Sequence, residues 1–296
     1  EARRAGRRTG TLLWPGADAR GLDRMGDFGV VWPSGPLAGS EVVELGPDDG
    51  ETLKTASGLA ELRSVTGDLR GAEALLDEIN AVYRRRRDLV VEALNAVDFL
   101  EGEVEEIPPE GTLAPDSYEV RAGESRAELL AEMAERQEAR LSEAWANRVD
   151  GLPIETPEEA LILASIIEKE TGVPEERRTV ASVFVNRLNR GMRLQTDPTV
   201  IYGIGPDFDG NITRKHLRTD TPYNTYTRRG LPPTPIAMAG RAAIHAALHP
   251  ADGDELFFVA TGLGDGSHKF SVSKDEHDAA VAEYLQRLRE RRRQGR

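Results

Sequence analysis

The chain has 296 residues, which is long enough for one large domain or two modest ones. Hydrophobic residues make up 39% of it and charged residues 30%, which is typical of a globular protein and too polar for a protein with many membrane spans. With 38 Lys and Arg against 51 Asp and Glu, the net charge of −13 repels phosphate backbones, so nucleic acid is not expected as a partner.

The chain contains no cysteine, which excludes disulfides, thiol nucleophiles and Cys-ligated zinc but favours neither an oxidising nor a reducing compartment. It also contains no run of about 18 apolar residues, so neither a signal peptide nor a membrane anchor is expected within it. Either feature, if present, belongs before Glu1 in a longer precursor.

The first hundred residues predict short strands followed by helix. Within residues 1–60, apolar runs at 30–32 and 42–45 are bounded by turn-forming residues and indicate strands. From 68 to 99 the apolar residues recur at helical spacing, which predicts one or two amphipathic helices. The acidic stretch 101–110 contains Pro108 and Pro109, and we place a domain boundary near it.

Two helices of different character are predicted beyond this boundary. The segment 125–146 indicates a surface helix whose charged side chains face solvent. The next helix opens with Thr156 as N-cap, Pro157 at its first position and Glu159 completing a capping box, and Gly172 can close it in a left-handed cap. Residues 160–167 are apolar on nearly every side, which predicts a helix that is buried all round.

The remainder of the chain completes an α+β outline. A helix is predicted from Pro174 to Gly191, packed on the preceding one. Residues 195–235 are rich in Thr, Tyr, Pro and Gly, a composition typical of a binding surface built from loops. A helix at 240–248, a strand at 255–260 and a basic C-terminal tail at 286–296 follow, and the basic residues of that tail are interpreted as solvated surface.

Glu168 directly follows the apolar run, on the helical face of Leu161 and Ser165. A partly desolvated carboxyl there has its pKa raised, and such a group can give a proton to a leaving-group oxygen and later take one back. A structural interpretation competes with this one, in which Glu168 is the first exposed residue after a core helix and pairs with Lys169 or Arg177.

Two other carboxyls are candidates for a role in the same chemistry. Glu170 is the alternative catalytic residue, but it is rotated by roughly 200° from Glu168 on a helix, so both cannot line one site unless the helix has ended. Asp197 could supply the second carboxylate of a glycosidase, as nucleophile or as the base that activates water. Asp before Pro also starts turns, and spacing alone leaves both roles of Asp197 open.

Aromatic, amide and imidazole side chains supply further candidates. The run 222–227 combines tyrosine rings, on which a pyranose can stack, with an amide that can pair with hydroxyls, although a turn around a buried tyrosine fits it equally well. His245 and His249 have the spacing of a helical metal pair without an evident third ligand, so no metal and no cofactor is expected. His268 follows a Gly-rich turn and is predicted to lie in a loop.

Several motifs in one order closely resemble the endolytic murein transglycosylase (MltG, YceG-like) family. The resemblance covers residues 101–285 and rests on EGTLAPDSY at 110–118, ASIIEKETGV at 164–173, VFVNRL at 183–188, GMRLQTDPTVIYG at 191–203, PYNTY at 222–226, GLPP at 230–233 and GSHKFS at 266–271, with Glu276 and His277 after it. It implies three segments: a poorly assigned N-terminal part at 1–100, a catalytic domain with a lysozyme-like transglycosylase fold at 101–285, and the tail at 286–296. In the family the N-terminal part resembles a LysM-like module that follows a membrane helix, and this chain shows no such helix.

The family resemblance implies cleavage of glycan strands in nascent peptidoglycan between N-acetylmuramic acid and N-acetylglucosamine. No water is used, and the product carries a 1,6-anhydro-muramic acid end, a reaction that helps to terminate strand elongation. Glu168 would act alone, as acid and then as base, and substrate-binding roles fall to Asn186, Gln195, Asp197, Tyr223, Asn224 and His268.

The same resemblance implies a place and partners, and two other functions stay open. The expected location is the periplasmic face of the bacterial inner membrane, beside peptidoglycan synthases.

The family commonly has Asn-Pro-Gly where this chain has Met238, Ala239 and Gly240, so one amide is missing. The alternatives are a hydrolase that uses Glu168 and Asp197 as a carboxylate pair, and a peptidoglycan-binding protein without activity.

Overall fold

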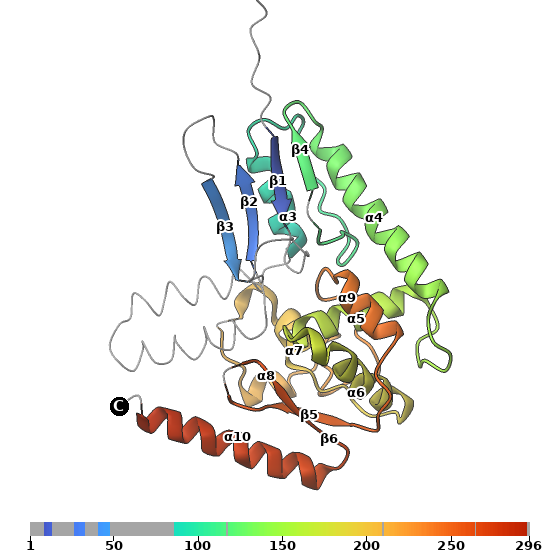
Figure 1. Cartoon of the computed structure of the whole chain (residues 1–296), viewed down its shortest axis with the longest axis vertical. Helices are drawn as coiled ribbons and strands as arrows, with labels where there is room; N and C mark the ends of the chain where they lie inside the picture. Colours follow the sequence, from blue (N-terminus) through green and yellow to red (C-terminus); the bar gives the residue numbers. More distant parts are fainter. Residues whose placement is uncertain are drawn as a thin grey trace, which may run out of the picture. The chain divides into compact units, whose positions relative to one another are not determined.

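The computed structural model of the chain describes residues 9–13, 27–32, 41–47, 86–116, 118–208, 210–263 and 265–294 (Figure 1). It combines helices with two small sheets, which confirms the α+β class. The chain divides into two compact units. The first comprises Glu1–Arg140, Gly205–Asn211 and Ala237–Gly240, and the second comprises Leu141–Ile204, Ile212–Ile236 and Arg241–Arg296.

An antiparallel sheet with the strand order β3-β2-β1-β4 belongs to the first unit (Figure 1). Its strands are β1 (Thr9–Leu13), β2 (Asp27–Trp32), β3 (Glu41–Pro47) and β4 (Tyr118–Arg121). β2 and β3 confirm the strands predicted at 30–32 and 42–45. β4 pairs with β1 in the register Thr11 to Glu119 and Leu12 to Tyr118. The predicted division at residue 100 stays a prediction.

Two helices complete the first unit's core. α3 (Arg86–Ala96) confirms the end of the predicted helical stretch, and residues 68–85 of that prediction lie outside the described residues. α4 (Arg126–Ala146) confirms the helix predicted at 125–146, and its residues up to Arg140 belong to this unit. The buried core residues come from α3, β4, α4 and the segments between them: Val90, Leu94, Val97, Leu100, Leu113, Tyr118, Val120, Leu129, Met133 and Met238.

The expectation that the charged side chains of α4 all face solvent is wrong. Arg126 is buried and its Nε donates a 2.7 Å hydrogen bond to the carbonyl of Leu94, while its other nitrogens donate to carbonyls that include Val97. These carbonyls lie at and beyond the C-terminal turn of α3, where the backbone lacks helical partners and the helix dipole favours a cation. Arg126 therefore caps α3 from the neighbouring helix.

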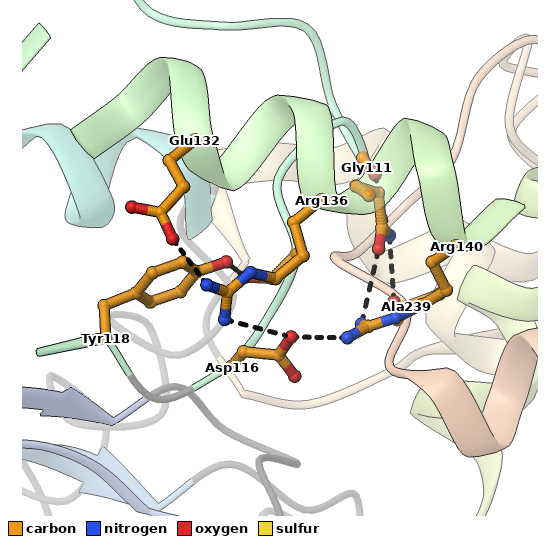
Figure 2. A network of polar contacts seen from close by, with 9 residues as sticks. Gly111, Asp116, Tyr118, Glu132, Arg136, Arg140 and Ala239 are labelled. Atoms are coloured by element: carbon orange, nitrogen blue, oxygen red, sulfur yellow. Dashed lines mark hydrogen bonds and ion pairs between the residues drawn. The ribbon is translucent and has the colours of Figure 1, made fainter. Parts of the chain in front are cut away.

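A second polar group on α4 is formed by Arg136 and Arg140, which both pair with Asp116 (Figure 2). The guanidinium of Arg136 also lies 4.5 Å from the centroid of the Tyr118 ring and pairs with Glu132. The phenol of Tyr118 donates to the carbonyl of Ala114, and burial raises its pKa far above the usual range. The segment before β4 is thereby tied to α4.

Residues 237–240 belong to the first unit through one side chain and one backbone contact. Met238 is 4% exposed and packs in the core named above. Gln137 on α4 uses its amide nitrogen to donate to the carbonyls of Ala239, at 2.9 Å, and Gly111, at 3.2 Å. Position 238, where the resemblance noted above implies an asparagine, is thus a core methionine in this chain.

α5 (Pro157–Glu170) is the central helix of the second unit, and α6 (Arg177–Asn189), α7 (Asp197–Ile204) and α9 (Arg241–Leu248) pack against it (Figure 1). α6 follows the short 3-10 turn η1 (Pro174–Glu176), so the predicted helix from Pro174 and its packing on α5 are confirmed. α9 confirms the helix predicted at 240–248.

The expectation of a purely loop-built segment at 195–235 is wrong. α7 lies within it, as does the short helix α8 (Arg214–Arg218), and the turn η2 (Gly205–Asp207) follows α7. Both helices are short, with eight residues in α7 and five in α8, and the Pro and Gly residues of α7 favour turns locally, so the sequence pattern alone did not reveal them.

The last part of the second unit is a β-hairpin and a long helix. β5 (Phe257–Ala260) pairs antiparallel with β6 (His268–Ser271), and β5 confirms the strand predicted at 255–260. α10 (Lys274–Gln294) packs along both strands (Figure 1). Residues 286–294 of the predicted basic tail are the last turns of this helix. No helix in the described ranges is both long enough and apolar enough to cross a lipid bilayer.

Candidate active site

The local sequence of α5 explains why the helix forms and why it is buried. Thr156 caps its N-terminus by accepting a 3.2 Å hydrogen bond from the backbone N–H of Glu159. The Glu159 carboxylate bonds to the N–H of Glu155, one residue before the cap, rather than closing the predicted capping box at Thr156. All residues from Ala160 to Ile167 are buried, which confirms the prediction of a helix enclosed all round.

Glu168 lies in the last turn of this helix and is half-buried, between the fully buried Ile167 and the buried Lys169. The helix ends two residues later, where Thr171 takes extended backbone with φ −143° and ψ 130°. The predicted left-handed cap at Gly172 is therefore not formed, and Thr171 instead accepts a hydrogen bond from the N–H of Val173. The structure thus places Glu168 as a half-buried residue directly after the buried run from Ala160 to Ile167.

Glu170 has a different environment. It is only 8% exposed, and its Oε1 accepts a hydrogen bond from the hydroxyl of Thr196, which is also buried. Glu168 is therefore the less buried of the two glutamates, and their spacing on a helix directs them to different sides.

The turn before α7 holds the one described residue other than glycine with a positive φ, namely Gln195 at 53°. The left-handed region strains the backbone of residues that carry a Cβ atom. Glycine adopts it easily, and asparagine and aspartate adopt it more readily than other residues. The N–H of Gln195 donates to the carbonyl of Thr225, and the N–H of Thr196 donates to the Thr225 hydroxyl. Gln195 itself is exposed, so the turn presents its amide to solvent.

Arg187 supports the same turn from α6. Its Nη1 donates to the carbonyls of Leu194, at 2.7 Å, and Arg193, and its Nε donates to the carbonyl of Leu256. Burial lowers the pKa of this guanidinium, while the nearby Tyr226 and Glu170 act in the opposite direction. Three backbone carbonyls thus accept hydrogen bonds from this buried cation and offset the cost of burying its charge.

Asp197 is the first residue of α7, where an acidic side chain suits the helix dipole. Its Oδ1 accepts a 2.6 Å hydrogen bond from the phenol of Tyr226. Burial, followed by the charge and the hydrogen bond of Asp197, raises the pKa of Tyr226 far above its usual range. Tyr226 is therefore a neutral hydrogen-bond donor under ordinary conditions, and one oxygen of Asp197 is engaged by it.

Tyr223 and Tyr202 form a half-buried aromatic pair with ring centroids 4.8 Å apart, and the phenol of Tyr223 bonds to the hydroxyl of Thr234. Glycine at 203 permits this approach, since a Cβ there would lie 2.8 Å from the hydroxyl of Thr221 and 3.2 Å from Cβ of Tyr223. The pair offers partly exposed ring surface beside α7, which suits stacking against a sugar.

Asn224 and Asn186 use their amides within the protein. Asn224 is 1% exposed, and its nitrogen donates to the carbonyls of His216, Leu217 and Thr219 while its oxygen accepts from the N–H of Tyr226. Asn186, half-buried on α6, donates to the carbonyls of Gly253 and Glu255. Both residues hold loops in place, and their predicted contact with substrate stays a prediction.

The prediction that His268 lies in a loop is wrong. It is the first residue of β6, and its side chain is 6% exposed. Its Nδ1 lies 2.7 Å from Oε2 of Glu176, whose other oxygen accepts from the His268 N–H. The ring also meets Phe258 edge-on. Glu176 thus fixes the imidazole of His268 in a buried position.

Metal binding finds no support among the described residues, which contain no group of three or more His, Asp or Glu side chains arranged around a common point. The His245 and His249 rings stack 4.4 Å apart, and Nε2 of His249 contacts the carbonyl of Asn147. These two histidines join the end of α9 to the loop before α5.

Five residues that support the candidate site were not identified from the sequence: Glu176, Arg187, Thr196, Thr225 and Tyr226. Four of them lie within the quoted motifs VFVNRL, GMRLQTDPTVIYG and PYNTY, so the motifs carried a signal that residue types alone did not.

Comparison with known proteins identifies close relatives. A model of the YceG-like family matches residues 51–283. The endolytic murein transglycosylase of Bacillus subtilis is 36% identical over 178 residues, which is 60% of this chain and 48% of that protein. The endolytic murein transglycosylase of Streptococcus pneumoniae is 32% identical over 182 residues, 60% of this chain and 32% of that protein. The chain thus spans about half or less of the length of these curated relatives.

A solved structure supports the fold. The crystal structure of a yceG-like protein from Listeria monocytogenes superposes with a TM-score of 0.52 at 31% identity, covering 70% of this chain and 71% of that one.

Proposed function

The chain belongs to the YceG-like family, and from this membership we propose that it is an endolytic murein transglycosylase, a lyase that cuts the glycan strands of peptidoglycan. The proposed bond lies between N-acetylmuramic acid and N-acetylglucosamine, and the proposed product carries a 1,6-anhydro-muramic acid end. The relatives named above bear this activity in their names. We extend the activity in those names to this chain, which matches each relative over about 180 residues.

The observation that carries the proposal is the environment of Glu168. It is a half-buried carboxyl in the last turn of α5, directly after the buried run from Ala160 to Ile167, whereas Glu170 is buried against Thr196 and Asp197 accepts a hydrogen bond from Tyr226. Glu168 is therefore the carboxyl of this group that is best placed to meet a sugar.

The proposed reaction needs one acid/base group. Glu168 donates its proton to the glycosidic oxygen as the bond from that oxygen to the anomeric carbon breaks. The resulting carboxylate then takes the proton of the muramic acid 6-hydroxyl while the oxygen of that hydroxyl bonds to the anomeric carbon. The proton returns to Glu168 and no water is consumed, so the anhydro end is lighter by one water than a hydrolysed end.

The finer assignments of residues and domains form part of the same proposal. A lysozyme-like helical centre is built around α5, and the N-terminal part corresponds to a LysM-like module. Gln195, Tyr223 and His268 contact the strand, and Asp197 orients it through Tyr226. Asn186 and Asn224 support the loops that line the site.

The proposed setting is the outer face of the bacterial cytoplasmic membrane, in proximity to peptidoglycan synthases. There the cut would terminate nascent strands. These partners and this place follow from the family alone.

The test is digestion of purified glycan strands by the chain, followed by mass spectrometry of the products. Wild type releases fragments with anhydro ends, and Glu168→Gln releases none. Glu158→Gln, which changes an exposed carboxyl on the same helix, is the matched control and keeps full activity.

Two results would replace the proposal. Reducing ends in the wild-type digest would establish a hydrolase that uses Glu168 and Asp197. Binding of strands by wild type and Glu168→Gln alike, without fragments from either, would establish a binding protein.

A further inference from the structure

We propose that Glu170 is a positioning residue that, through Thr196, holds Gln195 in its left-handed conformation and so fixes the amide of Gln195 relative to Glu168. This inference rests on the proposed function and goes beyond it by assigning Glu170 a role other than that of a second acid.

The strain at Gln195 is the first observation. A residue with a Cβ pays about 1 kcal/mol or more for the left-handed region, and such conformations persist where surrounding contacts over-determine them. Glycine would avoid this cost, yet the chain has glutamine here, with φ 53° and an exposed side chain. The strained backbone therefore serves to direct a long amide side chain outward.

The contacts that over-determine the turn are the second observation. Arg187 binds the two carbonyls that precede Gln195, and Thr225 binds the two N–H groups of Gln195 and Thr196. The Thr196 hydroxyl donates to Glu170. Thr199 adds a hydrogen bond to the Thr196 carbonyl. Backbone atoms on both sides of Gln195 are thus held, and its side chain is left exposed.

Glu170 is the anchor that links this turn to the proposed acid. It shares the last turn of α5 with Glu168, so a hydrogen bond from Thr196 to Glu170 ties the position of Gln195 to the helix that carries Glu168. A hydroxyl-to-carboxylate bond is stronger than a neutral one and is little screened in a buried setting. Arg187 and Thr225 brace the turn from other segments and do not create this link.

The same geometry argues against Glu170 as an acid. Its carboxyl is 8% exposed and covered by Thr196, so a glycosidic oxygen would have to displace the turn to reach it. Its charge instead acts on neighbouring buried groups, because it raises the pKa of Arg187 and of Tyr226.

The experiment compares four variants that change one end of this hydrogen bond at a time. Glu170→Ala and Thr196→Val remove the acceptor and the donor. Glu170→Gln and Thr196→Ser keep an acceptor and a hydroxyl, and they are the matched conservative controls. Circular dichroism and thermal melting establish that each variant folds, and if Glu170→Ala does not, the two Thr196 variants carry the test.

The expected result on glycan strands is a fall in kcat/KM of about ten- to hundredfold for Glu170→Ala and Thr196→Val, the range that misplacement of a binding group produces. The conservative variants stay within about threefold of wild type, and Glu170→Gln keeps the wild-type pH profile. The double variant Glu170→Ala with Thr196→Val is no worse than either single change, because both remove the same contact.

Two kinetic outcomes overturn the inference. Loss of activity in Glu170→Gln as complete as in Glu168→Gln would make Glu170 an acid. Full activity in both Glu170→Ala and Thr196→Val would show that the contact does not position the turn.

Hydrogen exchange tests the same contact without relying on activity. The amides of Gln195 and Thr196 are hydrogen-bonded, so a peptide spanning 193–199 should exchange at least about tenfold faster in Thr196→Val than in Thr196→Ser. Equal exchange in the two variants overturns the inference. If wild type itself releases no fragments, the proposed function fails, and this measurement still decides the role of Glu170.

Discussion

The phenol of Tyr226 donates a 2.6 Å hydrogen bond to Oδ1 of Asp197, at the point where α7 begins. Replacing Tyr226 with phenylalanine should lower the free energy of unfolding by about 1.5–3 kcal/mol, because the lost bond has a carboxylate acceptor. Tyr223→Phe is the matched control, since it loses a 2.8 Å bond between two hydroxyls and should cost about 1 kcal/mol. Urea unfolding of both variants measures the difference, and an equal or larger loss in Tyr223→Phe would contradict the prediction.

The stability of the protein should fall as the pH drops from about 7 toward 5, in part because of His277. Burial lowers the pKa of this imidazole, and the charge of Lys274 lowers it further. The unfolded chain binds a proton near the ordinary histidine pKa of about 6.5, while the folded protein resists protonation until the pH is lower. The unfolded state therefore binds more protons in this window, and acid favours it.

The variant His277→Gln isolates this effect. It should show a shallower decline of unfolding free energy than wild type across the same pH range, measured by urea titration at several pH values. Parallel declines would show that the buried ring contributes nothing. His245, whose pKa is also lowered by burial, remains in both proteins and cancels in the comparison.

Asn224 should prove to be a stability residue. Asn224→Ala removes the donor shared by the carbonyls of His216, Leu217 and Thr219, and should cost about 1–3 kcal/mol for the buried groups left unpaired. Asn224→Asp keeps the size but sets a carboxylate against those carbonyls, so it should cost at least as much. Thermal denaturation of both variants gives the answer, and wild-type stability in Asn224→Asp would refute this account of the amide.

Restoring the family's common asparagine at position 238 should harm the protein. Met238 is buried among apolar side chains, so Met238→Asn places an amide in the first unit's core and should lower the unfolding free energy by about 2–4 kcal/mol. Met238→Leu conserves volume and should cost less than about 1.5 kcal/mol. A stable Met238→Asn protein with increased strand cleavage would instead show that the missing amide served the substrate.

The helix that carries Glu168 was predictable because its signals are local. Thr156 and Pro157 mark its start, and the apolar run after them has no polar side to leave exposed. Its end was not predictable, since Thr171 is buried in an extended conformation while Gly172 suggests a left-handed cap. Tertiary packing decided between two locally acceptable endings.

The support around the site depends on contacts between distant residues, which no single stretch of sequence contains. The same holds in the first unit, where Arg126 and Arg140 look like surface charges on α4 although their acceptors lie more than twenty residues away. Glutamine has no local preference for the left-handed region, so nothing at position 195 indicated the turn that Arg187, Thr196 and Thr225 impose.

Neither compact unit is a continuous stretch of the chain, because 205–211 and 237–240 belong to the first unit although they lie between segments of the second. A single cut near residue 140 would therefore leave Met238 without the core residues at 90–133 that surround it. A recombinant fragment that is meant to keep this core intact should therefore include all three segments of the first unit.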